Sequence, residues 1–370
     1  MAVAIARSTD ELERLRARWG RIPWEREEAE LDYLLLRART RPEVVAPFGL
    51  VVPGDRGAAG RIEEQRLPAR FGYRTVVAPK VRVLRIVDGG LVGADALDAL
   101  RPLLREVDAI AFPPLPVGSE LAQAAHDLGG RLRRQPFAPV TERRRLALPE
   151  SFDEFLASRT RKIRSGIRHD SARLEEAFGE AAHVKVLHRP GDADQLVRDL
   201  DHVASATYQR SLGAGFADTL EQRALVRLGL ERGWTRAYVL YHGKEPVAYW
   251  HCSTYRATLH LLRTGFDPAY ARHRPGVYLL MRVLEDAIGD PSLSVVDFGP
   301  GEATYKRHFS SESSLERQET VFAPTWRGLR TNALRAPVLG AAQLARRTLD
   351  VSELTDQVRT RRRARLRTPR

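Results

Sequence analysis

The chain has 370 residues, of which 43% are hydrophobic and 29% are charged, a composition typical of a globular protein with room for two cores. The formal net charge is +13, and seven arginines between Arg359 and Arg370 supply +7 of it, which leaves +6 for the rest. A body of such modest charge is not by itself a nucleic-acid-binding surface, and it is expected for a protein that holds a phosphorylated cofactor. No apolar run reaches the roughly 18 residues of a transmembrane helix, and the start is too briefly apolar for a signal peptide, so we expect a cytoplasmic protein.

Cysteine and histidine usage excludes further classes of protein. Cys252 is the single cysteine, so there is no internal disulfide framework and no cysteine-based metal site. Four histidines of the stretch 250–309, namely His251, His260, His273 and His308, lack metal-ligand spacing. Neither a phosphate-binding Walker loop, a nucleophile elbow nor a Ser-His-Asp motif occurs. The sequence therefore predicts no metal.

The first 150 residues alternate between predicted strands and helices. A capping box at 8–11 begins a helix, strands follow at 44–52, 75–78, 81–87 and 108–112, and helices at 95–101 and 119–128. The glycine-rich stretch 53–68 is expected to be a mobile loop. This alternation predicts an α/β (α+β) fold class.

Residues 143–148 form another predicted strand, and a capping box at 151–154 begins a helix with an apolar stripe from Phe152 to Phe178. The opposite face of this helix is basic, and it is turned toward a cleft, toward a polyanionic partner or simply toward solvent; its residues are Arg159, Arg161, Lys162, Arg164 and Arg168. Helices at 194–208 and from 219, and a hairpin at 237–250, complete this part.

The stretch 257–309 carries the strongest pattern. A strand at 257–264 is followed by a polar loop, and Gly276 opens an amphipathic helix. A second strand at 294–297 turns through 298–301 into a short helix at 302–309. The first turn of the helix after the polar loop offers unpaired N–H groups to an anion, Gly276 has no Cβ to obstruct it, and Arg272 and Arg274 add charged donors.

This order of elements, with Arg-x-Arg-Pro-Gly at 272–276, Val-Asp-Phe-Gly-x-Gly at 296–301 and Tyr-Lys-x-x-Phe at 305–309, resembles the GNAT acyltransferase superfamily. It is most similar to the CelD-like acetyltransferase branch, which is related to the Fem-type aminoacyl transferases. The resemblance covers 151–324, although the usual Gln/Arg-x-x-Gly-x-Gly/Ala loop is reduced here to one arginine and one glycine. It implies tandem GNAT-like units with mixed sheets: a degenerate unit at 1–150, a GNAT acyltransferase domain at 151–330, and a helical extension with a disordered arginine-rich tail at 331–370. The alternative for 1–150 is a mixed α/β domain that has no catalytic role of its own.

The resemblance also implies a site. Acetyl-CoA, or another acyl-CoA, would be held by Arg263, Thr264, Arg272, Arg274, Gly276 and Val277. Strands 259–264 and 294–297 would splay and free a backbone N–H for the carbonyl oxygen. Tyr305 would protonate the departing thiolate, since a phenol titrates near pH 10.

Other residues have open roles. Asp297 and Glu302 are the carboxylates that could take a proton from the acceptor, but Asp297 could equally cap the turn at Gly299. Lys306 could bind the acyl carbonyl, a phosphate or a carboxylate, or be an ordinary surface lysine. The acceptor would contact residues of the 208–216 region and the hairpin, namely Tyr208, Arg210, Phe216 and Trp250.

The expected activity is the transfer of an acetyl or acyl group to an amine or hydroxyl of a sugar, polysaccharide or cell-envelope precursor. Two alternatives remain open: a Fem-type transferase that uses aminoacyl-tRNA, and a non-catalytic GNAT-like binding protein. The expected partner is a small-molecule or glycan acceptor, and the tail is basic enough to touch an acidic membrane or RNA.

Overall fold

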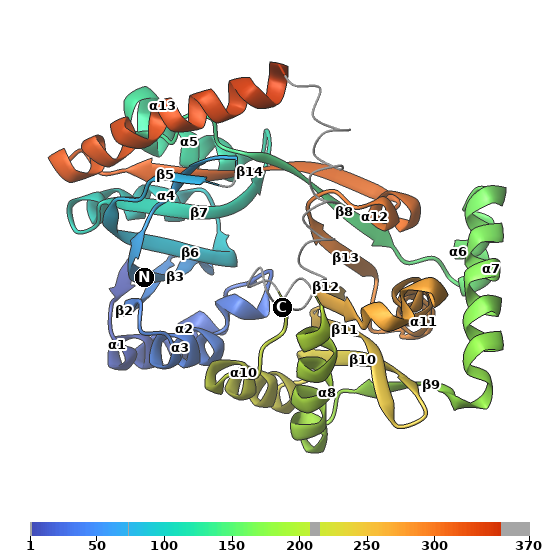
Figure 1. The fold of residues 1–370 in the computed structure, drawn as a ribbon. Helices are drawn as coiled ribbons and strands as arrows, with labels where there is room; N and C mark the ends of the chain where they lie inside the picture. The colour runs from blue at the N-terminus through green and yellow to red at the C-terminus, as the bar shows by residue number, and fades with distance from the viewer. Residues whose placement is uncertain (1, 73, 208–214, 349–370) are drawn as a thin grey trace. The chain divides into compact units, whose positions relative to one another are not determined.

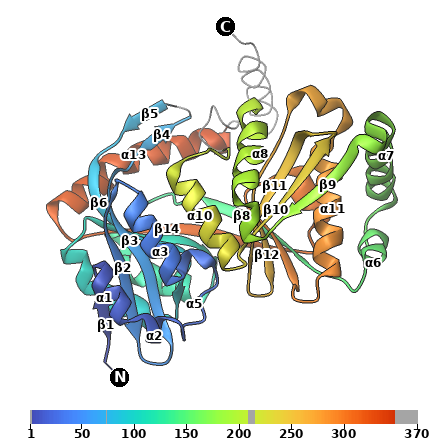
Figure 2. The same cartoon turned by 90° about the horizontal axis from the view of Figure 1, so that it is seen from below.

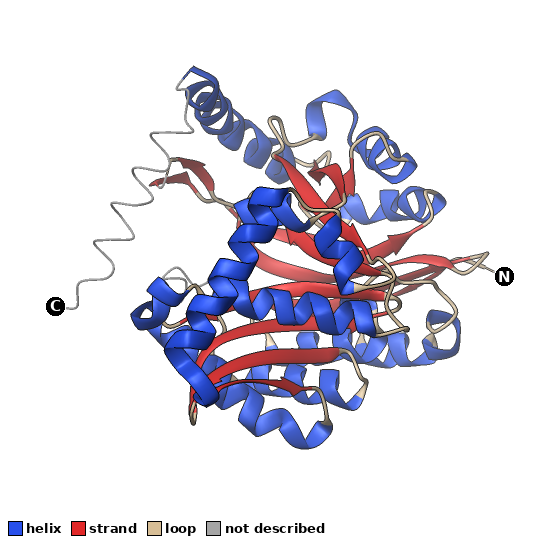
Figure 3. Ribbon diagram, turned by 90° about the vertical axis from the view of Figure 1, so that its right-hand side faces the viewer, coloured by secondary structure: helices blue, strands red, loops and turns tan. Residues whose placement is uncertain are grey.

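The computed structural model describes residues 2–72, 74–207 and 215–348, so Tyr208, Arg210 and the arginine-rich tail lie outside the described residues. The chain divides into two compact units, Met1–Thr141 with Leu315–Arg370, and Glu142–Ser314. In each unit helices cover the faces of a mixed sheet (Figure 3). The predicted α/β (α+β) class is confirmed.

Among the residues that the structure describes, the first unit contains six strands of the main sheet in the spatial order β1-β2-β3-β6-β7-β14, and only β6 and β7 run parallel (Figure 1). A separate two-stranded sheet pairs β4 with β5. In chain order the elements are β1 (Ala4–Ala6), α1 (Thr9–Arg14), α2 (Arg16–Trp19), η1 (Glu27–Ala29), α3 (Leu31–Thr40), β2 (Val44–Val52), β3 (Arg56–Arg66), β4 (Ala69–Phe71), β5 (Arg74–Val77), β6 (Lys80–Val92), α4 (Asp95–Leu100), η2 (Arg101–Arg105), β7 (Ala109–Pro116), α5 (Glu120–Arg133), β14 (Glu312–Phe322) and α13 (Trp326–Thr348).

The second unit has strands in the order β9-β10-β11-β12-β13-β8, and within its described ranges only β12 and β13 run parallel. Its elements are β8 (Val140–Ala147), α6 (Phe152–Ala157), α7 (Arg161–Phe178), η3 (Gly179–Ala181), β9 (Ala182–Leu187), η4 (Pro190–Asp192), α8 (Ala193–Ala206), α10 (Leu220–Glu231), β10 (Thr235–His242), β11 (Glu245–Tyr255), β12 (Thr258–Phe266), η5 (Pro268–His273), α11 (Pro275–Gly289), β13 (Val295–Pro300) and α12 (Thr304–Phe309).

The two strand orders have the same pattern: three antiparallel pairings, one parallel pairing and a final antiparallel pairing. A helix follows the fourth strand in both, α4 in the first unit and α11 in the second. The sixth strand is exchanged along the chain, because β8 is the strand after β7 but pairs with β13, and β14 is the strand after β13 but pairs with β7. The repeat confirms the tandem architecture.

The second unit buries an apolar cluster on each face of its sheet. On one face Trp250 of β11 packs with α6, α7 and α11, and on the other its neighbour Tyr249 packs with α8 and α10 (Figure 2). Adjacent residues of a strand point to opposite faces of the sheet, which explains why the side chains of Tyr249 and Trp250 belong to different clusters. These two faces organise the site described below.

The expected mobile loop at 53–68 is wrong, since β3 occupies most of it. Its glycines are needed for close strand packing: a Cβ on Gly60 would lie 2.7 Å from the carbonyl oxygen of Arg85 on β6. Ala58, Ala59 and Ile62 are buried beside it. Small residues here serve strand contact rather than flexibility.

The single helix expected from Phe152 to Phe178 is also wrong, because the chain forms α6 and α7 with a break at 158–160. The Thr160 hydroxyl accepts a hydrogen bond from the N–H of Ile163 at 3.3 Å and so caps a new helix. The unit boundaries differ from the expected ranges 1–150, 151–330 and 331–370, because β14 pairs with β7 and α13 packs on β4. Within the described ranges, no helix has the length and apolar character to cross a membrane.

Candidate functional site

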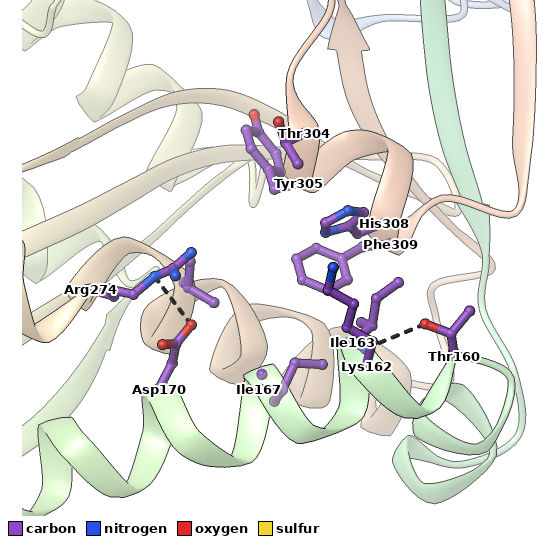
Figure 4. Close-up of a pocket in the computed structure, with 12 residues that line it drawn as sticks. Thr160, Lys162, Ile163, Ile167, Asp170, Arg274, Thr304, Tyr305, His308 and Phe309 are labelled. Atoms are coloured by element: carbon purple, nitrogen blue, oxygen red, sulfur yellow. Dashed lines mark hydrogen bonds and ion pairs between the residues drawn. The ribbon is translucent and has the colours of Figure 1, made fainter.

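A pocket of about 640 Å³ lies in the second unit between α7, the start of α11 and α12 (Figure 4). Helix α7 lines one side with Lys162, Gly166 and Asp170, while Arg274 and Tyr305 line it from the other elements. The remaining lining residues are Thr160, Ile163, Ile167, Val277, Thr304, His308 and Phe309. In Figure 4 the Lys162 side chain extends toward His308 and Phe309, so cationic and apolar groups meet in one space.

The N-terminus of α11 forms part of this pocket through Arg274 and Val277. Arg274 is the N-cap residue in the left-handed conformation (φ 51°, ψ 47°), and its Nε lies 3.2 Å from Oδ2 of Asp170. Pro275 has no N–H, and the Val277 and Tyr278 N–H groups donate to the Arg274 carbonyl at 3.0 and 3.3 Å. Within the described chain, the Gly276 N–H is therefore the donor of this first turn left for an anion.

Other expected cofactor-binding residues do not line this pocket. The nearest atom to a Cβ on Gly276 would be Cδ1 of Phe266 at 3.6 Å, an ordinary contact. Arg272 donates from Nε to His273 at 2.8 Å. Arg263 donates to Gln222 of α10 at 2.9 Å, and Thr264 donates to the Tyr249 carbonyl at 2.9 Å. Of the expected set, the structure brings Arg274 and Val277 into the pocket.

Tyr305 is packed between two aromatic rings. Its ring meets Trp250 edge-on at 5.9 Å and Phe298 at 6.3 Å. Burial raises the pKa of the Tyr305 phenol to about 12. The group therefore stays protonated at neutral pH and is able to donate a proton into the pocket.

Asp297 is 1% exposed and already has partners. Arg143 donates from Nε to its Oδ2 at 2.8 Å, and the Gly299 N–H donates to Oδ1 at 2.7 Å. Burial alone would raise the pKa of this carboxyl, but the adjacent His260 ring and the charge of Arg143 hold it well below its usual range. Such a carboxylate is a weak base, so the geometry favours the turn-capping role.

Lys306 and Glu302 lie near the same turn. Lys306 is 8% exposed and donates to the carbonyl oxygens of Gly299 at 3.1 Å and Pro300 at 2.8 Å. This lysine therefore clamps the turn and is not a surface residue. Glu302 is exposed and does not line the pocket.

Two of the expected acceptor residues, Phe216 and Trp250, lie on opposite faces of the sheet. Phe216 is fully buried and packs against the His251 ring at 5.9 Å in the cluster of α8 and α10. Trp250 is buried on the opposite face beside Tyr305. Strand β11, which carries Trp250, also carries the buried Cys252. Burial raises the pKa of the Cys252 thiol, which suits a core residue rather than a nucleophile.

Strands β12 and β13 part within the unit. Their parallel pairing runs from Thr258 opposite Val295 to His260 opposite Asp297 and ends there, while the other edge of β13 is paired with β8 from Val295 to Pro300. The expected splay is thus present in the strand pairing. A split of this kind leaves backbone groups on the inner edge of β12 available to a carbonyl oxygen.

A cleft-facing helix α7 was one of the alternatives for its basic face, but the residues of α7 that line the pocket were not among the expected site residues. Gly166 is the signal that could have revealed them, because a glycine between Ile163 and Ile167 leaves a gap on a helix face. A Cβ on Gly166 would meet nothing within 4 Å. Among the described residues, no cluster of three or more histidine, cysteine or carboxylate side chains is arranged to hold a metal ion.

The chain was compared with known proteins. The family model described as "Acetyltransferase (GNAT) domain" matches residues 161–307. Among solved structures, FemX is similar with a TM-score of 0.54 and 11% identity, covering 84% of this chain and 96% of FemX. The C-terminal domain of a putative lysylphosphatidylglycerol synthetase from Agrobacterium fabrum is similar with a TM-score of 0.52 and 10% identity, covering 89% and 97%. No curated protein matches the sequence. Residues 161–307 therefore match the GNAT acetyltransferase domain model, and the fold of the chain is similar to that of FemX.

Proposed function

We propose that this protein is an acyltransferase that takes an acetyl or acyl group from acyl-CoA and transfers it to an amine or hydroxyl of a sugar, polysaccharide or cell-envelope precursor. The observation that carries the proposal is the pocket between α7, α11 and α12, which is lined by Arg274 at the start of α11 and by Tyr305 of α12. Use of acyl-CoA would place the reaction in the cytoplasm.

The lining supports a phosphorylated, partly apolar donor. A volume of about 640 Å³ lies within the range of small-molecule sites. Lys162 and Arg274 supply positive charge for phosphate groups, while Ile163, Ile167 and Phe309 supply an apolar wall for the pantetheine arm. Tyr305 would give its proton to the departing thiolate. The chain's own residues thus offer phosphate binding, apolar contact and an acid.

Gly166 gives the sharpest test. Because a Cβ there meets nothing within 4 Å, Gly166→Phe should project its ring into the pocket without disturbing the core, whereas Gly166→Ala should leave most of the space open. Calorimetric titration with acetyl-CoA should give saturable binding to the native protein and to Gly166→Ala, and binding at least tenfold weaker to Gly166→Phe. Equal binding by all three proteins would refute this pocket as the donor site.

Aminoacyl-tRNA is the second candidate donor, because the first half of α7 exposes the basic residues Arg161, Lys162 and Arg168. If it is the donor, bulk tRNA should bind with a steep dependence on salt, and Arg161→Glu with Arg168→Glu should weaken binding and flatten that dependence. Binding of tRNA without binding of acetyl-CoA would favour this candidate. Binding of neither would favour a non-catalytic GNAT-like protein.

A further inference from the structure

Three polar residues stand side by side on the sheet of the second unit. Ser253 of β11 is opposite His260 of β12, and His260 is opposite Asp297 of β13. All three are buried, with exposed fractions of 3%, 6% and 1%. Their chain neighbours Leu259 and Val296 belong to the cluster under α11, so the alternation of strand side chains puts the polar row on the other face.

One end of the row is held in place by Asp297. Oδ2 of Asp297 is held by Arg143 at 2.8 Å and lies 3.5 Å from Nδ1 of His260. A carboxylate held in this way orients the imidazole and directs its Nδ1 edge toward Asp297. Nε2 is then the ring atom with which His260 can exchange a proton with a substrate.

Unpartnered polar atoms lie beside His260 on the same face. Within the described chain, Oγ of Ser253 and Nδ1 of His251 have no hydrogen-bond partner, although both residues are at least nine-tenths buried. Burial and the charge of Arg263 lower the pKa of His251 to about 3, so its ring is neutral. Buried polar atoms without partners are unfavourable, and a polar ligand on this face would satisfy them.

The row also lies where the strands separate. Pairing between β12 and β13 ends at His260 and Asp297. Tyr305 packs on the opposite face of the sheet, against Trp250 and Phe298. A thioester carbonyl held at this split would therefore have a proton donor on one face and the His260 row on the other.

We propose that His260 accepts the proton of the acceptor nucleophile, that Asp297 positions His260, and that Ser253 and His251 bind polar atoms of the acceptor. This inference rests on the proposed acyl transfer and names its acceptor side. The acceptor N–H or O–H proton moves to Nε2 of His260 as the nitrogen or oxygen bonds to the acyl carbon. The C–S bond breaks, the sulfur takes the Tyr305 proton, and the proton on His260 passes through solvent to restore Tyr305.

Several charged groups surround the row and set its response to pH. Arg143 and Arg145 approach Asp297 from β8, Lys306 of α12 lies at the adjoining turn, and Arg263 is on β12 opposite His251. Asp297 is the negative group that faces His260. Asp297→Asn should therefore move the acidic limb of kcat/KM to lower pH, a change that loss of a purely structural contact would not cause.

The decisive experiment uses the full chain with acetyl-CoA and glucosamine, followed by release of free thiol. We expect His260→Ala to lower kcat at least 100-fold with calorimetric acetyl-CoA binding unchanged, and added imidazole to restore at least a tenth of the rate. The matched control is His188→Ala, at an exposed histidine outside the row, which should keep native turnover and ignore imidazole.

Turnover of His260→Ala within twofold of native, or a loss that imidazole does not restore, would overturn the assignment of His260 while leaving acyl transfer intact. If His260→Ala does not fold, ¹⁵N NMR of the native protein decides: the Nδ1-protonated tautomer is expected, and the Nε2-protonated tautomer would overturn the proposal. Absence of acetyl-CoA binding would instead refute the proposed donor. Binding without thiol release, with glucosamine or water as acceptor, would refute the transfer step and this inference with it.

Discussion

The Tyr305 phenol is protonated at neutral pH, and burial raises its pKa to about 12. Tyr305→Phe preserves the ring contacts with Trp250 and Phe298 but removes the proton donor. We expect kcat to fall by about 100-fold with the KM for acetyl-CoA nearly unchanged, as measured by thiol release. The control is Tyr278→Phe, at a tyrosine of α11 whose hydroxyl meets Arg282 at 3.4 Å. Full turnover by Tyr305→Phe would assign the thiolate's proton to another source.

The ionisation of Asp297 makes the free energy of unfolding depend on pH. Its folded-state pKa is held below the unfolded value by His260 and Arg143 despite burial, so its stabilisation is complete above about pH 4 and is lost as the pH falls below that. Asp297→Asn leaves Arg143 buried without its anion and should cost about 3–5 kcal/mol at pH 7. Urea unfolding should show the gap between native and variant narrowing below pH 4; a gap that is constant with pH would contradict this account.

At the scale of elements, α7 lines the pocket with a glycine that lowers the stability of the helix. Gly166 lies within it, and a Cβ there would meet open space. Gly166→Ala should therefore stabilise the protein by about 0.4–1 kcal/mol, because it reduces the freedom of the unfolded chain. Denaturant unfolding measures the effect, with Gly179→Ala as the contrasting variant: Gly179 has φ +53°, so alanine there should destabilise. A loss of stability in Gly166→Ala would mean that the helix is strained at this position.

Element types were largely predictable from periodicity and caps. The strand at 44–52 coincides with β2, and the capping serines at Ser8 and Ser151 bond as expected. The loop at 53–68 could not be recognised as a strand, because the need for glycine arises from the neighbouring strand β6. The candidate site was predictable only in part. Tyr305 and Arg274 could be chosen because they lie close in sequence to recognisable turns. The row of Ser253, His260 and Asp297 could not, because these residues come together only through the register of three strands.

At the scale of the whole molecule, the exchanged strands make the two units unequal as fragments. Residues 140–314 contain all six strands of the second unit, from β8 to β13. Residues 1–141 lack β14, so β7 would lose its antiparallel partner and the buried residues Val321 and Phe322. We expect the fragment 140–314 to unfold cooperatively and the fragment 1–141 to remain unfolded or to aggregate. Circular dichroism and hydrogen exchange would reveal this, and a stably folded 1–141 fragment would contradict it.

The exchange also sets an order of events during synthesis on the ribosome. Domains generally fold as they emerge, the N-terminal one first. Here the first unit needs β14, which ends at Phe322, whereas the second unit has its last strand-forming residues by Pro300. The N-terminal half therefore cannot complete its sheet until the later half has been synthesised, because β7 has no antiparallel partner before β14. During that time the nascent first unit is the part that would need a chaperone.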